Sequence, residues 1–141
     1  MKERSIQIES RTEELIAVRD FVSRAAQDFG FSDEDVSKIA LAVDEACTNV
    51  IKHAYRYDAT KNLKVSIRGA KKSFEVTIHD NGRIFDPNGV KRPDMKEYLS
   101  HFRKGGLGVY LMKSLMDKVE YNIQPGSPNQ VRLIKYLPSN D

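Results

Sequence analysis

The amino-acid sequence predicts one α/β domain, a two-layer α+β sandwich in which a mixed, mostly antiparallel sheet carries helices on one face. Its 141 residues suffice for a single domain with a substantial core. Residues 63–68 and 74–79 alternate between apolar and polar side chains, which is typical of strands with one exposed face. A parallel sheet covered on both faces would instead give unbroken apolar runs.

The first half of the chain predicts one strand and two helices. Ile6 and Ile8 alternate with polar residues as a short first strand. Apolar residues at helical spacing then run from about Thr12 to a natural stop at Gly30. After a candidate N-cap serine at position 32, acidic residues occupy the first turn of a second helix, which we expect to continue to about Tyr55.

The second half begins with the two alternating segments and ends with two further strands. Between them, residues 83–104 show no periodicity, and a stretch of this length is commonly a lid or a binding loop. The glycines of residues 105–108 open a third helix. The closing strands are expected at residues 119–123 and 131–137.

Composition narrows the classes of function. The formal charge of +3 is mild and gives no concentrated basic face, so nucleic-acid binding has no support. The single cysteine, Cys47, falls on the apolar stripe of the second helix, where we expect an inert thiol in a reducing compartment. No signal peptide and no apolar run of about 18 residues is present, which predicts a soluble cytoplasmic protein without a membrane segment.

Three polar residues share one line on the second helix. Glu45, Asn49 and Lys52 are separated by four and three residues, so an α-helix makes them surface neighbours about 5–6 Å apart at Cβ. A base, an amide that can ligate a metal and an ammonium group could therefore meet one small ligand. The alternative is an ordinary solvated helix face.

A second motif, Asp80-Asn81-Gly82, ends the strand at residues 74–79. A carboxylate at the sheet edge can accept a hydrogen bond from the exocyclic amine of adenine, and a glycine lets the ring approach the backbone. Asn-Gly is also a common hairpin turn. The residues that follow do not continue as an alternating strand, which disfavours the hairpin.

The third motif is the glycine cluster, Gly105, Gly106 and Gly108. Backbone N–H groups and the dipole at the start of a helix can bind a polyphosphate, although glycines also serve as plain hinges. The sequence has neither a P-loop signature nor a dinucleotide fingerprint after its first strand. A nucleotide site in this chain must therefore be of another kind.

In this order, the three motifs resemble the N, G1 and G2 boxes of the gyrase, Hsp90, histidine-kinase and MutL ATPase superfamily, with its Bergerat ATP-binding fold. Three segments resemble those of the anti-sigma-factor serine kinases of bacterial stress response and sporulation. They are DEACTN at residues 44–49, HAY at 53–55 and GLGVYL at 106–111. The resemblance covers nearly the whole chain. It implies one histidine-kinase-like ATPase domain, residues 1–141, with a short ATP lid at residues 83–104.

The resemblance also implies roles for the matching residues. Asn49 would coordinate the Mg²⁺ that bridges the ATP phosphates, Asp80 with Gly82 would bind adenine, and Glu45 would be the general base. Other residues would contact the phosphates: Lys52, Arg103, Lys104, Gly105, Gly106, Leu107 and Gly108. This branch commonly has a threonine before its last strand that supports the adenine contact, and the chain departs from it with Asn129-Gln130.

The implied function is that of an ATP-dependent serine kinase and anti-sigma factor. Such a protein phosphorylates a serine of an anti-anti-sigma partner and sequesters a sigma factor, as a homodimer and without direct contact to nucleic acid or membrane. Two alternatives remain open from the sequence. One is a non-catalytic, ATP-gated module that binds a regulatory partner, and the other is a simple ATPase with water as the acceptor.

Overall fold

Five strands form one sheet in the part of the chain that the computed structural model describes, residues 2–81, 107–123 and 127–138. The strand order is β1-β2-β3-β5-β4, and every described pairing is antiparallel. The strands are β1 (Arg4–Glu9), β2 (Asn62–Ala70), β3 (Ser73–Asp80), β4 (Lys118–Asn122) and β5 (Asn129–Tyr136).

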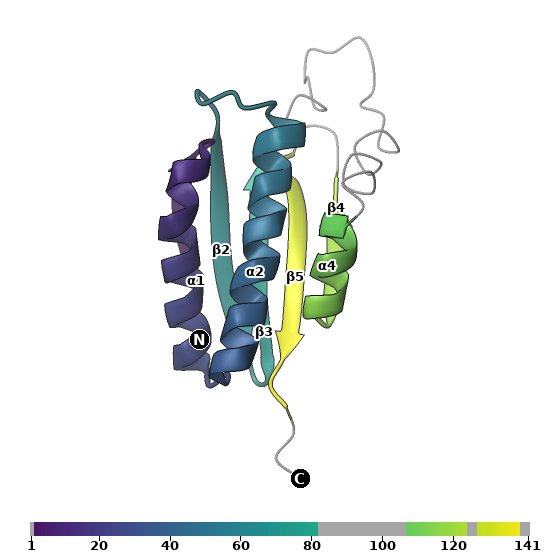
Figure 1. The fold of residues 1–141 in the computed structure, drawn as a ribbon. Helices are drawn as coiled ribbons and strands as arrows, with labels where there is room; N and C mark the ends of the chain where they lie inside the picture. Colours follow the sequence, from purple (N-terminus) through teal and green to yellow (C-terminus); the bar gives the residue numbers. More distant parts are fainter. Residues whose placement is uncertain (1, 82–106, 124–126, 139–141) are drawn as a thin grey trace.

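Three α-helices cover one face of this sheet in the described residues, and α2 lies between the other two (Figure 1). A short 3-10 helix, Thr12–Glu14, precedes the first of them, and a π-helix, Val50–Ala54, continues the second. The α-helices are α1 (Leu15–Phe29), α2 (Asp33–Asn49) and α4 (Leu107–Leu115). The predicted two-layer sandwich is confirmed.

The core lies between the sheet and the helices because the strands alternate as their sequence predicts. On β2, Leu63, Val65 and Ile67 are buried, while Lys64 and Arg68 are exposed on the opposite face. Alternation continues on β3 and β5, where the inward residues in the middle of each strand are apolar and the inward residues at one shared end of the sheet, Asp80 and Asn129, are polar. The apolar stripe of α2, including the buried Cys47, packs into this core, as predicted.

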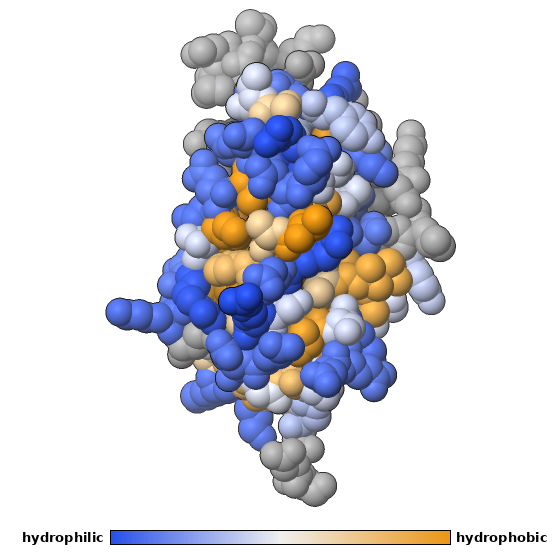
Figure 2. Space-filling view, turned by 60° about the vertical axis from the view of Figure 1, so that its left-hand side comes forward, coloured by the Kyte–Doolittle hydropathy of each residue, from blue (hydrophilic) through white to orange (hydrophobic). Residues whose placement is uncertain are grey.

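Some apolar residues of the helical layer are exposed, among them Ile16 on α1 and Leu41 on α2. Figure 2 shows apolar side chains among polar ones on the face turned toward the viewer. None of the helices in the described residues has both the length and the apolar character that a bilayer crossing requires.

The second helix continues to about Tyr55, as predicted, but its last turn is not α-helical. The α-helix ends at Asn49, and the following turn is a π-helix in which the backbone N–H of Tyr55 donates to the carbonyl of Val50 at 2.9 Å. Val50 and Ala54 are buried in this turn. Their spacing of four residues suits an α-helix as well, so the apolar pattern did not distinguish the two.

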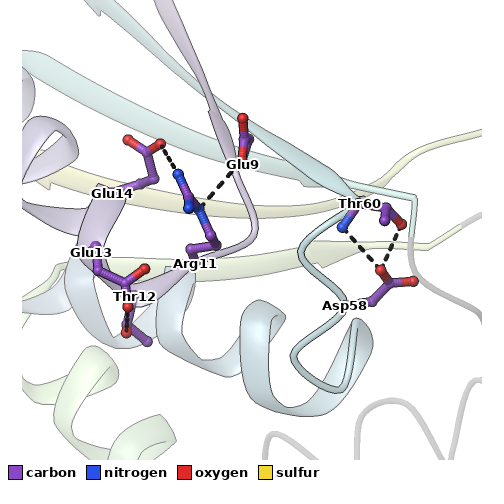
Figure 3. Close-up of polar contacts among 7 residues, drawn as sticks. All are labelled: Glu9, Arg11, Thr12, Glu13, Glu14, Asp58 and Thr60. Atoms are coloured by element: carbon purple, nitrogen blue, oxygen red, sulfur yellow. Dashed lines mark hydrogen bonds and ion pairs between the residues drawn. The ribbon is translucent and has the colours of Figure 1, made fainter.

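The chain leaves the π-helix through a tight turn. Arg56 and Tyr57 have φ angles of 49° and 63°, in the left-handed region. Asp58 then accepts hydrogen bonds from the backbone N–H and the hydroxyl of Thr60, at 3.0 and 2.6 Å (Figure 3). The turn delivers the chain to the start of β2.

The connection from β1 to α1 is held by a second local network. Arg11 forms ion pairs with Glu9 at 3.3 Å and with Glu14 at 3.4 Å (Figure 3). These side chains are largely exposed, so each pair adds little to stability. The network orients the turn more than it stabilises the fold.

Ser32 caps α2 as predicted, since its hydroxyl accepts a hydrogen bond from the backbone N–H of Asp35 at 3.2 Å. Replacing it with alanine (Ser32→Ala) should lower the free energy of unfolding by about 1 kcal/mol. Ser37→Ala makes the same change on an exposed position of the same helix and should change it by less than about 0.5 kcal/mol. Urea denaturation of both variants checks the cap, and equal losses would contradict it.

Candidate functional site

Four chain segments meet at one end of the sandwich, the upper end in Figure 1. They are the C-terminal end of α2, the end of β3 and the beginnings of α4 and β5. The antiparallel pairing of β3 with β5 brings the last residue of one opposite the first residue of the other. Asn49 and Asp80, each from one of the predicted motifs, therefore lie at the same end of the domain as the start of α4.

A buried hydrogen bond joins β3 to β5 at this end. Asp80 is 2% exposed and Asn129 is fully buried, and the two residues are direct partners in the antiparallel register. The Nδ2 group of Asn129 donates to Oδ1 of Asp80 at 3.0 Å. Both side chains face the helical layer, because Ile78 and Val131, two residues away on each strand, belong to the core.

The register of β5 against β3 determines whether Asn129 or Gln130 lies beside Asp80. β5 begins at Asn129, two residues earlier than predicted. Gln130 pairs with His79, and both belong to the opposite, open face of the sheet. Asn129 is therefore the side chain beside Asp80.

Two buried amide atoms at this end have no hydrogen-bond partner among the described residues. They are Nδ2 of Asn49, a side chain 5% exposed at the last position of α2, and Oδ1 of Asn129. A buried polar atom left unpaired costs about 1–3 kcal/mol. Such atoms gathered at one end of a domain are expected where a ligand completes the hydrogen bonding.

The amide of Asn49 also suits a magnesium site. Mg²⁺ prefers oxygen ligands and is commonly held by few side chains together with substrate phosphates. In the described ranges no group of three or more His, Cys, Asp or Glu residues could hold a metal by itself. A magnesium ion held by Asn49 would therefore need further oxygen ligands, which phosphate groups can supply.

Glu45 and Asp44 are adjacent carboxylates with different surroundings. Asp44 forms an ion pair across to α1, with Arg19, at 2.9 Å. Glu45 is half-buried one turn before Asn49 and forms no ion pair or hydrogen bond within the described part of the chain. Its carboxylate is therefore not committed to a structural role.

Lys52 lies in the π-helix, beyond the point where α-helical spacing applies, and is exposed. The prediction that Lys52 lies on the same helix face as Glu45 and Asn49 assumed α-helical winding, which ends at Asn49. A phosphate contact by Lys52 stays a prediction.

The predicted phosphate-binding motif is only partly within the described residues. α4 begins at Leu107, so Leu107 and Gly108 form its first turn. The lid and five predicted site residues lie outside the described ranges: Gly82, Arg103, Lys104, Gly105 and Gly106.

Tyr55, the last residue of the HAY segment, connects three elements at this end, a role that the family resemblance did not assign to it. Its side chain is 1% exposed. The hydroxyl donates to the backbone carbonyl of Asn62 at 2.6 Å and accepts from the backbone N–H of Asn81 at 2.7 Å. It thereby ties the π-helix to the start of β2 and to the residue that follows Asp80.

Burial raises the pKa of Tyr55 from its ordinary 10.0 to about 12, the hydrogen bond from Asn81 lowers it in part, and the negative charge of Asp80 raises it further. The tyrosine therefore stays protonated and keeps its donor at neutral pH. Burial, with a smaller contribution from Asp44, also raises the pKa of the Cys47 thiol, which makes it a poor nucleophile.

Comparison with known proteins identifies a matching family and similar proteins over most of the chain. The sequence pattern of the family described as "Histidine kinase-like ATPase domain" matches residues 8–135. The serine-protein kinase RsbW of Bacillus subtilis (strain 168) is 34% identical over 139 residues, covering 94% of this chain and 84% of that protein. RsbW of Bacillus thuringiensis (strain Al Hakam) is 29% identical over 136 residues, covering 94% and 83%.

A solved structure has the same fold. The crystal structure of the RsbU and RsbW domains of a Mycobacterium tuberculosis protein superposes with a TM-score of 0.67 at 14% identity. The match covers 96% of this chain and 32% of that longer one.

We expect Tyr55→Phe to lower the free energy of unfolding by about 1–3 kcal/mol, because two part-buried hydrogen bonds to the backbone are lost. A pH series adds a second readout. The folded-state pKa lies above the ordinary value of 10.0, so this residue's contribution is complete below pH 10 and is lost as the pH rises toward about 12. The difference between parent and variant should therefore shrink over that range.

Urea denaturation from pH 8 to pH 11.5 measures this difference. Tyr136→Phe, at a tyrosine 42% exposed, is the matched control and should match the parent at every pH. Equal stability of parent and Tyr55→Phe at pH 8 would contradict the positioning role.

Proposed function

Because the chain belongs to the family of histidine kinase-like ATPase domains, with RsbW serine-protein kinases among its relatives, we propose that it is an ATP-dependent serine kinase and anti-sigma factor. It transfers the γ-phosphate of ATP to a serine of an anti-anti-sigma protein. When that partner is absent or already phosphorylated, it sequesters a sigma factor.

The observation that carries this proposal is the convergence of three buried polar side chains at one end of the sheet, two of which, Asn49 and Asn129, have an amide atom without a partner among the described residues. Asp80 and Asn129 lie on neighbouring strands, and Asn49 ends the helix that packs over them. A plain structural domain has no use for these groups inside its core, where each incurs a desolvation cost. A nucleotide supplies the missing partners.

In the proposed complex Asp80 accepts a hydrogen bond from the 6-amino group of adenine, and Gly82 leaves room for the ring. The N-terminal turn of α4, with the glycines before it, binds the phosphates through backbone N–H groups. Lys52, Arg103 and Lys104 add positive charge at this position.

Asn49 would hold a magnesium ion through its side-chain oxygen, and the bound ion would neutralise charge on the phosphates. Glu45, one turn earlier, accepts the proton of the serine hydroxyl as its oxygen bonds to the γ-phosphorus. The bond from that phosphorus to the bridging oxygen breaks, and ADP leaves. A base of this kind typically contributes about 10²–10⁴ in rate.

The setting of the reaction is also proposed. The resemblance to anti-sigma kinases supports a cytoplasmic homodimer that binds its two protein partners in turn and contacts neither nucleic acid nor membrane directly. A non-catalytic, ATP-gated binding module is the competing function, and phosphate transfer distinguishes the two.

Two substitutions separate chemistry from binding. Glu45→Ala should keep the Kd for ATP within about threefold of the parent, because the base does not contact the nucleotide in the ground state, and should slow phosphate transfer by about 10²–10⁴. Asp80→Asn should weaken ATP binding by at least about tenfold, because it removes a charged acceptor from a buried site.

Calorimetric titration with ATP and Mg²⁺ measures binding, and transfer of labelled γ-phosphate to an anti-anti-sigma protein of the same genome measures turnover. Asp44→Ala, at the neighbouring carboxylate that pairs with Arg19, is the matched control and should retain both. Parental transfer by Glu45→Ala would refute the base. Nucleotide binding without transfer by the parent would favour the binding module.

A further inference from the structure

The open face of the sheet, which is turned away from the helices, carries a polar hollow. Its volume is about 240 Å³, which is large enough for a small molecule together with water. Gln7, Lys64 and His79 are successive cross-strand partners on β1, β2 and β3, so their side chains share this face. Five lining residues carry polar side chains: Gln7, Asn62, Lys64, His79 and Asn81.

This hollow is separate from the proposed nucleotide site. Asp80 and Asn129 face the helical layer, whereas His79, the residue before Asp80, lies on the opposite face of β3. A ligand in the hollow would therefore bind behind the strand that carries Asp80 and would not contact the carboxylate from the nucleotide side.

The lining of the hollow favours an anion. All five polar side chains can donate hydrogen bonds, and no carboxylate lines the hollow in the described part of the chain. Lys64 is exposed and forms no ion pair with a described residue. Glu9 lies opposite Asn62 in the register of β1 and β2, but it is already paired with Arg11 at 3.3 Å.

His79 lies between this hollow and a second, smaller one on the same face, because it lines both. Its Nε2 atom is 3.3 Å from the Oγ atom of Ser66, which lines the second hollow. When the hydroxyl of Ser66 donates to Nε2, the hydrogen of the neutral ring is on Nδ1. That nitrogen is then a donor available to a ligand.

The charges around His79 keep its ring neutral at neutral pH. Burial lowers the pKa of His79, the positive charge of Lys64 lowers it further, and Glu3 raises it in part. A bound anion would act in the opposite direction to Lys64 and favour the protonated ring. The other charged residues of the second hollow are Arg68, Glu75 and Arg132.

We propose that the hollow binds a small molecule with a phosphate group, which Lys64, His79 and the neighbouring side-chain amides hold. Its donors come from three strands and from the residue that follows β3, which suits a tetrahedral oxyanion better than a planar carboxylate. A neutral ligand would gain nothing from the charge of Lys64. This inference does not rest on the proposed kinase function.

The first test titrates the protein with inorganic phosphate at pH 7, with chloride at equal ionic strength as the reference for screening. The ring resonances of His79 should shift and saturate with phosphate alone. Lys64→Gln should weaken binding by about tenfold or more, the size of one charge-assisted hydrogen bond. Lys61→Gln makes the same change at an exposed lysine outside the hollow and should keep the Kd within about twofold of the parent.

Glycerol phosphate repeats the titration with a phosphate monoester. Tighter binding than that of inorganic phosphate identifies a monoester as the preferred ligand, and weaker binding identifies the free ion. Both results support the site.

Sulfate, whose charge is constant between about pH 5.5 and pH 8, isolates the contribution of the ring. Its affinity should rise about three- to tenfold as the pH falls over this range, because the anion raises the pKa of His79. His79→Asn should lose this rise. Thermal unfolding establishes that each variant is folded under the conditions of titration.

An unchanged His79 spectrum with all three anions overturns the inference, and so does a parental Kd for phosphate in folded Lys64→Gln. Either result leaves the kinase proposal standing, since that proposal is tested by ATP binding and phosphate transfer. Loss of ATP binding or transfer would in turn leave this site untouched.

Discussion

Burial of the Asp80 carboxylate at the end of β3 is the constraint on which the rest of this end of the domain depends. An acidic side chain that is 2% exposed must find donors inside the protein or in a ligand. The structure supplies one donor from the facing strand, the amide of Asn129. Because the Nδ2 group of Asn129 donates to Asp80, the side-chain oxygen of Asn129 is left as an acceptor without a partner among the described residues.

The winding changes from α-helix to π-helix at the end of α2, and Tyr55 follows this turn. From this position its hydroxyl bonds to the backbone of Asn62 and Asn81, the residues just beyond the pair formed by Leu63 and Asp80. π-helical turns often occur at functional sites. Here the wider turn follows directly after Asn49. Through Tyr55, the helix that carries Glu45 and Asn49 is therefore anchored to the residue that follows Asp80.

Much of this was predictable from the sequence, because alternation and helical spacing are local properties. Leu63, Val65 and Ile67 predicted both a strand and its buried face, and Ser32 predicted where α2 begins. The change to a π-helix was not predictable, since Val50 and Ala54 satisfy either winding. Nor could the sequence choose between Asn129 and Gln130, because the choice depends on the register of β5 against β3. The role of Tyr55 depends on two backbone groups that are distant in sequence.

The central claim is that buried amides on α2 and β5 surround one nucleotide, and their side-chain NMR signals test it most directly. On titration with ADP and Mg²⁺, the side-chain amide resonances of Asn49 and Asn129 should both shift with a single Kd, whereas that of the exposed Asn122 should not move. If the nucleotide leaves the signals of Asn49 and Asn129 unchanged, or shifts them with different affinities, these residues do not form one site.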